Sequence, residues 1–275
     1  MHPIFHLGII ELPAYGSIIF IGLLVGTVIA MLTAHRYEVS RLDIMLSTIL
    51  ATIGLLIGAK VVYMISVLPE IVTNFHYVKS HIFKTIVYMF SGYVFYGGLI
   101  GALLTYYFYC WWFKINFGSL MNVITPVIPL VHSFGRIGCF MGGCCYGIKY
   151  NGRLAIHYPY NEFEPELNLF PRFPVQLTES LINFLFFLIL ITYAKKKRPN
   201  GSILGIYLIG YAIIRFSLEF LRGDVERGIW FGVSTSQWIS LILIPVGIHI
   251  LRKTYMAQTK KTVEKKAVDK KEGIR

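Results

Sequence analysis

Long runs without a charged residue are the main constraint on the fold of this chain. Residues 12–34, 85–113 and 228–251 contain no Asp, Glu, Lys or Arg. A helix needs roughly 20 apolar residues to cross the hydrocarbon core of a bilayer. Within lipid every backbone polar group must bond inside the protein, and continuous runs of this length favour helices over barrel strands. We therefore expect an all-α membrane protein.

Seven segments have the length and apolar character of membrane spans. They are residues 12–34, 44–69, 85–113, 115–135, 174–194, 199–221 and 228–251. Pro126 and Pro129 are expected to kink the fourth span. The N-terminus lacks early Lys or Arg and a small-residue cleavage site, so we expect the first span to be retained. Residues 1–253 are thus interpreted as one domain with about seven transmembrane helices.

Composition excludes several other classes of protein. Hydrophobic residues make up 55% of the 275 residues and charged residues 15%, which excludes disordered and coiled-coil chains. The net charge of +12 resides mostly in short loops and in residues 254–275. We expect this basic tail to be disordered or to lie on anionic lipid, and we expect no nucleic-acid partner.

Basic residues also predict the orientation. The densest internal cluster is residues 195–198, between the fifth and sixth spans, and basic loops favour the cytoplasm. We expect the N-terminus outside and the C-terminus in the cytoplasm. The segment 136–173, rich in Gly, Pro, Tyr and Asn, would then form an outer loop or cap.

A glycine-rich segment at the end of the fourth span is the first candidate site. Residues 133–147 contain five glycines and Arg136. Glycines let the backbone approach a ligand, and the guanidinium fork suits phosphate. A lipid-headgroup site and a helix cap with a snorkelling arginine are equally compatible with this pattern.

Charged residues in the sixth span are the second candidate. Arg215 and Glu219 are four residues apart and can pair on one helix face, a role we expect to be structural. Arg222 lies three residues beyond Glu219, near the membrane boundary, and we expect it to bind a ligand.

Further polar residues enter apolar layers and need partners. Gln176 and Glu179 open the fifth span and serve either a cavity or the attachment of the cap. Lys60 binds a headgroup phosphate or pairs with an acid such as Glu219. Tyr96 precedes a glycine pair, Gly97 and Gly98, that admits a neighbouring helix or an acyl chain.

The segments together resemble the bacterial prolipoprotein diacylglyceryl transferases over residues 12–251. The strongest match is the glycine-rich signature around Arg136 and Gly138. Supporting matches occur in the family's order at Tyr15-Gly16, at residues 96–101, 172–179 and 219–222, and at Ser236-Gln237.

The resemblance implies an enzyme that needs no cofactor or metal. Such enzymes transfer the diacylglyceryl group of phosphatidylglycerol to the thiol of a lipobox cysteine in a preprolipoprotein, releasing glycerol phosphate in the bacterial inner membrane. It assigns Arg136, Arg222 and Tyr96 to catalysis. It assigns the following residues to substrate binding: Arg136, Tyr15, Lys60, Gly97, Gly98, Gly138, Cys139, Cys144, Gln176, Glu179, Glu219 and Gln237.

The chain departs from the family pattern at Lys60, where many members have Arg, and at four further positions. Tyr96 stands where the family has His, and Cys139, Gly142 and Cys144 stand where it has Asn, Asn and Glu. Tyr has a reference pKa near 10 and is a poor base at neutral pH. Because the family lacks thiols at these positions, the resemblance implies that the cysteines are not the catalytic centre.

Three alternatives remain open from the sequence. A paralogous transferase would use the same lipid with another acceptor. A redox or metal-handling membrane protein would use Cys139, Cys144 and Cys145, although no Cys-x-x-Cys is present. A channel or transporter is disfavoured because no internal repeat is visible.

Overall fold

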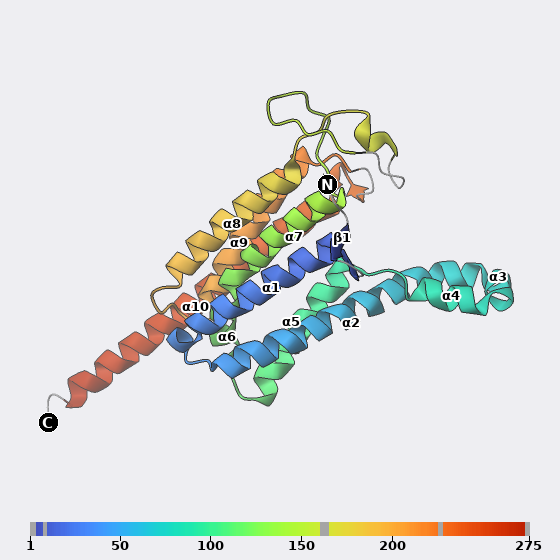
Figure 1. Ribbon diagram of the computed structural model, residues 1–275. Coiled ribbons are helices and arrows are strands. Elements are labelled where there is room, and N and C mark those ends of the chain that lie inside the picture. Colours follow the sequence, from blue (N-terminus) through green and yellow to red (C-terminus); the bar gives the residue numbers. More distant parts are fainter. Residues whose placement is uncertain (1–3, 8–9, 160–164, 225–227, 273–275) are drawn as a thin grey trace. The chain divides into compact units, whose positions relative to one another are not determined.

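The computed structural model describes residues 4–7, 10–159, 165–224 and 228–272 (Figure 1). The chain divides into two compact units, which are described separately. Unit 1 comprises Met1–Glu38 and Gly118–Arg275, and unit 2 comprises Val39–Phe117.

Helices make up most of the described chain, as expected. They are α1 Ala14–Thr33, α2 Arg41–Thr73, α3 Phe75–Ser80, α4 Ile82–Met89, α5 Phe95–Trp112, α6 Phe117–Ile124, α7 Ile128–Gly142, α8 Val175–Tyr193, α9 Ser202–Leu218 and α10 Thr235–Glu272. Short 3₁₀ helices are η1 Ala34–Tyr37, η2 Thr125–Val127, η3 Pro165–Asn168 and η4 Glu219–Leu221. Two small antiparallel hairpins pair β1 Ile4–Leu7 with β2 Ile10–Pro13 and β3 Ile229–Trp230 with β4 Val233–Ser234.

Six helical segments within the described residues are long and apolar enough to cross a membrane. They are Ala14–Tyr37, Arg41–Thr73, Phe117–Gly142, Val175–Tyr193, Ser202–Leu221 and Thr235–Glu264. These match six of the seven expected spans and confirm an all-helical membrane protein.

The expected span over residues 85–113 is not continuous. The helix breaks between Met89 and Phe95, so the apolar run is divided between α4 and α5. α5 has only 18 residues, several of them Tyr or Trp, and it is not among these six segments. Tyr and Trp are typical of membrane interfaces, which explains why an uncharged run need not be an aliphatic span.

The prolines of the fourth span break its helix as expected. α6 and α7 are separated by η2, which contains Pro126, and Pro129 lies in the first turn of α7. Proline cannot donate an intrahelical hydrogen bond, so a tighter 3₁₀ turn forms here. The span Phe117–Gly142 is the most buried of the six, which places α7 at the centre of unit 1.

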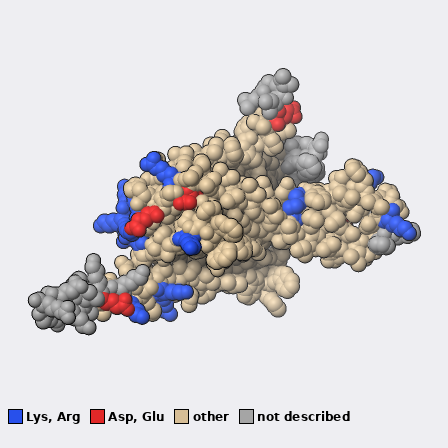
Figure 2. All heavy atoms as spheres, turned by 90° about the horizontal axis from the view of Figure 1, so that it is seen from below, with Lys and Arg blue, Asp and Glu red and all other residues tan. Residues whose placement is uncertain are grey.

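Glycines allow α1 to approach α7 closely in unit 1. A Cβ at Gly22 would lie 2.6 Å from Phe134 Cβ, and one at Gly26 would lie 3.1 Å from a Val131 methyl. α7 also packs on α8, and α9 on α10 (Figure 1). The outer faces carry many exposed aliphatic side chains, and the surface drawn in Figure 2 is mostly uncharged. That surface suits lipid rather than water.

The polar contacts of unit 1 gather at two opposite ends of its helices. At the first, the backbone around Gly147 bonds to Leu221 and Phe173. We call this the glycine-rich end. At the other, here called the basic end, the Asn122 amide group donates to the carbonyl oxygen of Pro199 at 2.9 Å, and Lys197 pairs with Glu38. Arg136 and Arg222 therefore share one end, and the basic cluster 195–198 lies at the other.

In unit 2, glycines bring α2 and α5 into backbone contact. A Cβ at Gly97 would lie 2.4 Å from the carbonyl oxygen of Gly58, and one at Gly101 would lie 2.1 Å from that of Gly54. Small residues at such positions are typical of tightly packed membrane helices. Of the two expectations for these glycines, a neighbouring helix or an acyl chain, the structure therefore shows the helix: α2 packs against the glycine face of α5.

The basic tail continues α10. The backbone is helical as far as Glu272, and the expectation that residues 254–275 are disordered or lie on anionic lipid stays a prediction. The last three residues lie outside the described part of the chain.

Candidate functional site

Arg136 lies in the last two turns of α7 and contacts the start of α8. Its Nη2 is 3.1 Å from Glu179 Oε1, and both side chains are largely buried. His132, one turn earlier on α7, accepts a hydrogen bond of 3.4 Å from Arg136 Nε and lies 3.5 Å from the same carboxylate. Glu179 therefore joins α8 to α7 through Arg136. Its expected role in a cavity or in attaching the cap stays a prediction.

Arg222 is held at the end of the sixth span by the loop that follows α7. The backbone of Arg222 forms an isolated antiparallel bridge with Gly147, and Ile148 N donates to Leu221 O at 3.0 Å. Glycine is needed at position 147, because a Cβ there would lie 2.3 Å from the carbonyl oxygen of Phe173. The glycine-rich segment thereby determines where the second arginine sits.

Asp224 fixes the orientation of the Arg222 guanidinium. Arg222 Nε donates to Oδ1 at 3.1 Å and Nη2 donates to Oδ2 at 2.5 Å, a bidentate arrangement. Burial opposes the charged form of Arg222, but the hydrogen bonds and negative charge of Asp224 outweigh it and raise the pKa of Arg222. The guanidinium therefore remains a fixed cation.

The expected pair of Arg215 and Glu219 is present. Arg215 Nη2 lies 2.8 Å from Glu219 Oε2, and both residues are buried. Arg215 Nη2 also donates to Ser236 Oγ at 3.0 Å, which joins α9 to the start of α10. These contacts are those of a structural pair.

Gln176 attaches the loop after α7 to the start of α8. Its side-chain amide donates to the carbonyl oxygen of Cys144 at 2.8 Å, and its Oε1 accepts from the Tyr158 hydroxyl at 2.9 Å. Gln176 is fully buried, and Tyr158 packs with Tyr146 and Leu167 in a small core of the loop. This arrangement matches the expected attachment of the cap.

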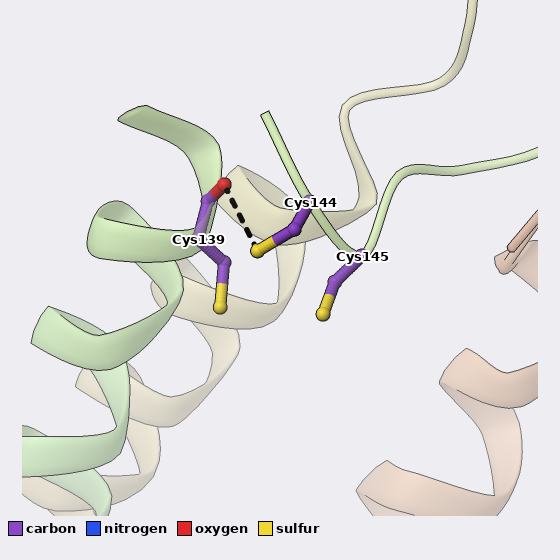
Figure 3. A group of neighbouring side chains, drawn as sticks. All are labelled: Cys139, Cys144 and Cys145. Atoms are coloured by element: carbon purple, nitrogen blue, oxygen red, sulfur yellow. Dashed lines mark hydrogen bonds between the residues drawn. The ribbon is translucent and has the colours of Figure 1, made fainter. Parts of the chain in front are cut away.

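Cys139, Cys144 and Cys145 converge beside Arg136. Their sulfur atoms all lie within 4.8 Å of one another, and Figure 3 shows Cys139 on the helix and the other two on the following loop. The pKa of Cys145 is lowered because the thiols of Cys139 and Cys144 hydrogen-bond to it, and the positive charges of Arg136 and Arg222 act in the same direction. Both arginines are therefore close enough to act on one sulfur.

Tyr15 at the start of α1 borders this group. A Cβ at Gly138 would lie 3.2 Å from Tyr15 Cα, so the absence of a side chain at position 138 lets the two helices meet. The electrostatic neighbours of the Tyr15 hydroxyl include Arg136 and the three cysteines. The site thus draws residues from α1, α7, the loop, α8 and the end of α9.

Other predicted residues occupy structural positions. Gln237 Oε1 accepts a hydrogen bond of 3.0 Å from Ser234 N, and Gln237 N donates to Ser234 Oγ, which together form a capping box at the start of α10. Their spacing, Ser-x-x-Gln, could have identified this cap in the sequence.

Tyr96, Lys60, Gly97 and Gly98 belong to unit 2. Lys60 Nζ donates to the carbonyl oxygens of Phe90 and Gly92 and lies 3.8 Å from the centre of the Tyr93 ring. Glu219 pairs with Arg215 within unit 1, and the expected binding of Lys60 to a headgroup phosphate or to an acid such as Glu219 stays a prediction. Tyr96 is 41% exposed, and the catalytic role expected for it stays a prediction.

Three residues that were not among the expected site residues complete the site, and one of them, His132, was expected to be structural. His132 precedes Arg136 by four residues on the same helix face, a spacing that could have indicated the contact. Asp224 and Tyr158 offered no comparable signal, since their partners are set by the turn after η4 and by the path of the loop.

Known proteins resemble the chain over nearly its full length. The family model described as prolipoprotein diacylglyceryl transferase matches residues 2–252. The phosphatidylglycerol–prolipoprotein diacylglyceryl transferase of Clostridium tetani is 31% identical over 252 residues, which cover 91% of this chain and 96% of that protein. The second such enzyme of Clostridium perfringens is 30% identical over 256 residues, covering 93% and 96%, and that of Pasteurella multocida is 29% identical over 270 residues, covering 94% and 93%.

Proposed function

This chain belongs to the prolipoprotein diacylglyceryl transferase family, and we propose that its glycine-rich end transfers the diacylglyceryl group of phosphatidylglycerol to a prolipoprotein cysteine. The chain is a membrane-embedded transferase. The observation that carries the site assignment is that the end of α7 and the loop after it hold both arginines: Arg136 on α7 pairs with Glu179, and the backbone of Gly147 bridges to that of Arg222.

Two fixed cations suit the leaving group of this reaction. As the thiol sulfur bonds to the glycerol carbon, the carbon–oxygen bond to the phosphate breaks and negative charge grows on the departing oxygen. Preorganised donors aimed at developing charge are a major source of catalysis. A buried, water-poor site strengthens their effect, since charges interact more strongly at low dielectric.

The carboxylates beside the arginines act as positioning residues. Glu179 holds Arg136 on one side, and Asp224 holds two nitrogens of Arg222. A guanidinium so held keeps its fork in one orientation and loses little freedom when a phosphate binds. Neutralising each arginine in part also lowers the cost of keeping two cations close together.

Substrate binding extends over the other residues of this end. Tyr15, Gly138, Cys139 and Cys144 border Arg136 and form the proposed surface for the lipid headgroup. Gln176 and Glu219 support that surface through the loop and α9. Tyr96, Lys60, Gly97, Gly98 and Gln237 stay proposals that rest on the family resemblance.

The chain spans the membrane several times, and we place its glycine-rich end at the outer face of a bacterial inner membrane. Residues 195–198 lie at the opposite end of unit 1 from Arg136, and clustered basic residues favour the cytoplasm. The C-terminal basic segment of α10 would then meet anionic lipid headgroups.

Complementation tests the function. Expression in a bacterium depleted of its own transferase should restore thioether-linked diacylglycerol on a reporter lipoprotein, measured by mass spectrometry of its N-terminal peptide. A reporter whose lipobox cysteine is replaced by serine controls for the acceptor atom. Consumption of phosphatidylglycerol without modification of the cysteine reporter would instead support a paralogous transferase with another acceptor.

A further inference from the structure

The three cysteines form a compact group of donor atoms that the proposed arginine chemistry does not use. Cys139 lies in the last turn of α7, and Cys144 N donates to the carbonyl oxygen of Cys139 at 3.1 Å. Gly143 and Cys145 both have left-handed backbone angles, with φ of 73° and 58°. This turn reverses the chain so that all three sulfurs face one region (Figure 3).

The turn explains how these cysteines can form a metal site although the sequence lacks a Cys-x-x-Cys motif. No Cys-x-x-Cys is present, yet the turn brings residues five and six positions after Cys139 back beside it. Zinc–sulfur bonds of about 2.3 Å put ligating sulfurs roughly 3.8–4.0 Å apart in trigonal or tetrahedral geometry. Sulfurs that already lie within 4.8 Å of one another need only small side-chain rotations to reach that separation.

The surrounding charge favours an anionic metal cluster. Three thiolates around a divalent cation carry a net charge of about −1. The positive charges of Arg136 and Arg222 both act on Cys145. Cations close to such a cluster offset part of the cost of holding several thiolates together in a partly buried place.

The fourth coordination position has to be supplied from outside this group. Within the residues that the structure describes, the group contains three ligand atoms, and its nearest ionisable neighbours are engaged elsewhere. His132 contacts Arg136 and Glu179, and Asp224 holds Arg222. Cys144 is exposed, so an incoming ligand has access to the sulfurs.

We propose that Cys139, Cys144 and Cys145 bind one thiophilic divalent cation such as Zn²⁺ and leave its fourth position to the acceptor cysteine. The role of that fourth position rests on the proposed function. Three protein ligands and one open position are typical of catalytic zinc. Metal coordination deprotonates a thiol, which supplies the nucleophile that Tyr96, as a poor base, does not.

The acceptor thiol releases its proton to water when its sulfur joins the metal. That sulfur then bonds to the glycerol carbon of the diacylglyceryl group, and the carbon–oxygen bond breaks with its electron pair passing to the phosphate oxygen. The product is a neutral thioether, a weaker ligand than a thiolate, so it leaves while the three cysteines keep the metal. Relatives with Asn and Glu at positions 139 and 144 would lack this site.

Metal binding is tested on the reduced full-length chain in detergent. Co²⁺ serves as a spectroscopic probe through its thiolate charge-transfer absorption, and Zn²⁺ competes for the same site. We expect one ion per chain. Cys144→Ser is the mildest change because that side chain is exposed, and it should weaken binding beyond the ~10–100-fold that outer-shell residues cost. Cys110→Ser, in unit 2, is the matched control and should bind as the parent does.

Three results would overturn the metal site. The first is that reduced, folded parent protein retains no ion, and the second is that the triple Cys139, Cys144 and Cys145 to Ser variant binds metal as well as the parent does. The third is a disulfide within the group in protein isolated without reductant, detected by alkylation and mass spectrometry, which would indicate a redox pair.

The open position is tested separately with two peptides. A lipobox peptide should change the charge-transfer band of the Co²⁺-loaded chain, whereas its cysteine-to-serine version should not. An unchanged band with the cysteine peptide rules out the acceptor as fourth ligand. A chain that transfers lipid without binding metal refutes this inference alone, and a chain that binds both metal and peptide but transfers nothing refutes the proposed function alone.

Discussion

Arg136 on α7 and Glu179 on α8 form a buried ion pair of 3.1 Å at the glycine-rich end of unit 1. The pair joins two membrane-spanning helices through a cation that we assign to phosphate binding. Stability and catalysis therefore both depend on this contact. Variants of Glu179 and Arg136, measured for unfolding and for turnover, separate the two effects.

Replacing Glu179 by Gln should destabilise the fold. Removing one partner of a buried ion pair leaves an uncompensated charge and typically costs about 3 kcal/mol or more. Thermal unfolding in detergent measures the change. Glu38→Gln, which removes the exposed pair with Lys197, is the control and should leave the unfolding curve in place. Equal unfolding temperatures for both variants would contradict a structural role for Glu179.

Replacing Arg136 or Arg222 by Ala should lower diacylglyceryl transfer by about 10²–10³-fold, the usual cost of losing one charge-stabilising donor. The Lys variants should recover only part of the rate, since the planar fork is lost. Turnover of a lipobox peptide with phosphatidylglycerol vesicles measures the effect. Arg215→Ala, which breaks the structural pair with Glu219, should reduce folding yield first. Parent-like turnover in folded Arg136→Ala or Arg222→Ala protein would refute the two-arginine site.

Gly147→Ala should displace Arg222. The added Cβ would lie 2.3 Å from the carbonyl oxygen of Phe173 and 3.0 Å from that of Leu221, so the backbone must move. Forced overpacking typically costs about 1–3 kcal/mol. Gly142→Ala is the matched control, because a Cβ there meets nothing within 4 Å. We expect lower stability and transfer for the first variant and neither loss for the second; similar behaviour of the two would contradict the proposed contact.

Gln176→Leu should loosen the loop between α7 and α8. It leaves the Tyr158 hydroxyl and the Cys144 carbonyl without these bonds, and each buried unsatisfied group costs about 1–3 kcal/mol. Limited proteolysis of residues 144–173 should accelerate. Thr178→Ala is the control: it removes a hydroxyl that donates to the carbonyl oxygen of Pro174 in the same helix turn, and its proteolysis should match that of the parent. Unchanged proteolysis in Gln176→Leu would show that other contacts hold the loop.

Reporter fusions should place the two ends of unit 1 on opposite sides of the membrane. A fusion after Lys195 should report the cytoplasm and one after Lys149 the outer side, because the basic cluster 195–198 resists translocation. Enzymatic reporters active on only one side of the membrane measure this. Both fusions on one side would overturn the orientation and the number of spans between them.

The sequence alone determined the all-helical membrane class, because uncharged runs of about 20 residues have no other stable place than a bilayer. It also predicted the Arg215–Glu219 pair and the break at Pro126, since both depend on neighbours within one helix. The family resemblance implied catalytic roles for Arg136 and Arg222, which stay predictions. The apolar run over residues 85–113 is divided between α4 and α5, a break that the absence of charge does not reveal.

Tertiary structure decided which residues meet between segments. Three contacts depend on how separate stretches of the chain pack. They are the ion pair of Arg136 with Glu179, the hydrogen bonds from Arg222 to Asp224 and the hydrogen bond from Gln176 to the carbonyl oxygen of Cys144. The grouping of Cys139 with Cys144 and Cys145 required a turn through two left-handed residues, which spacing alone does not reveal. Helical periodicity links residues three or four positions apart, whereas contacts between helices and loops depend on packing that no local pattern encodes.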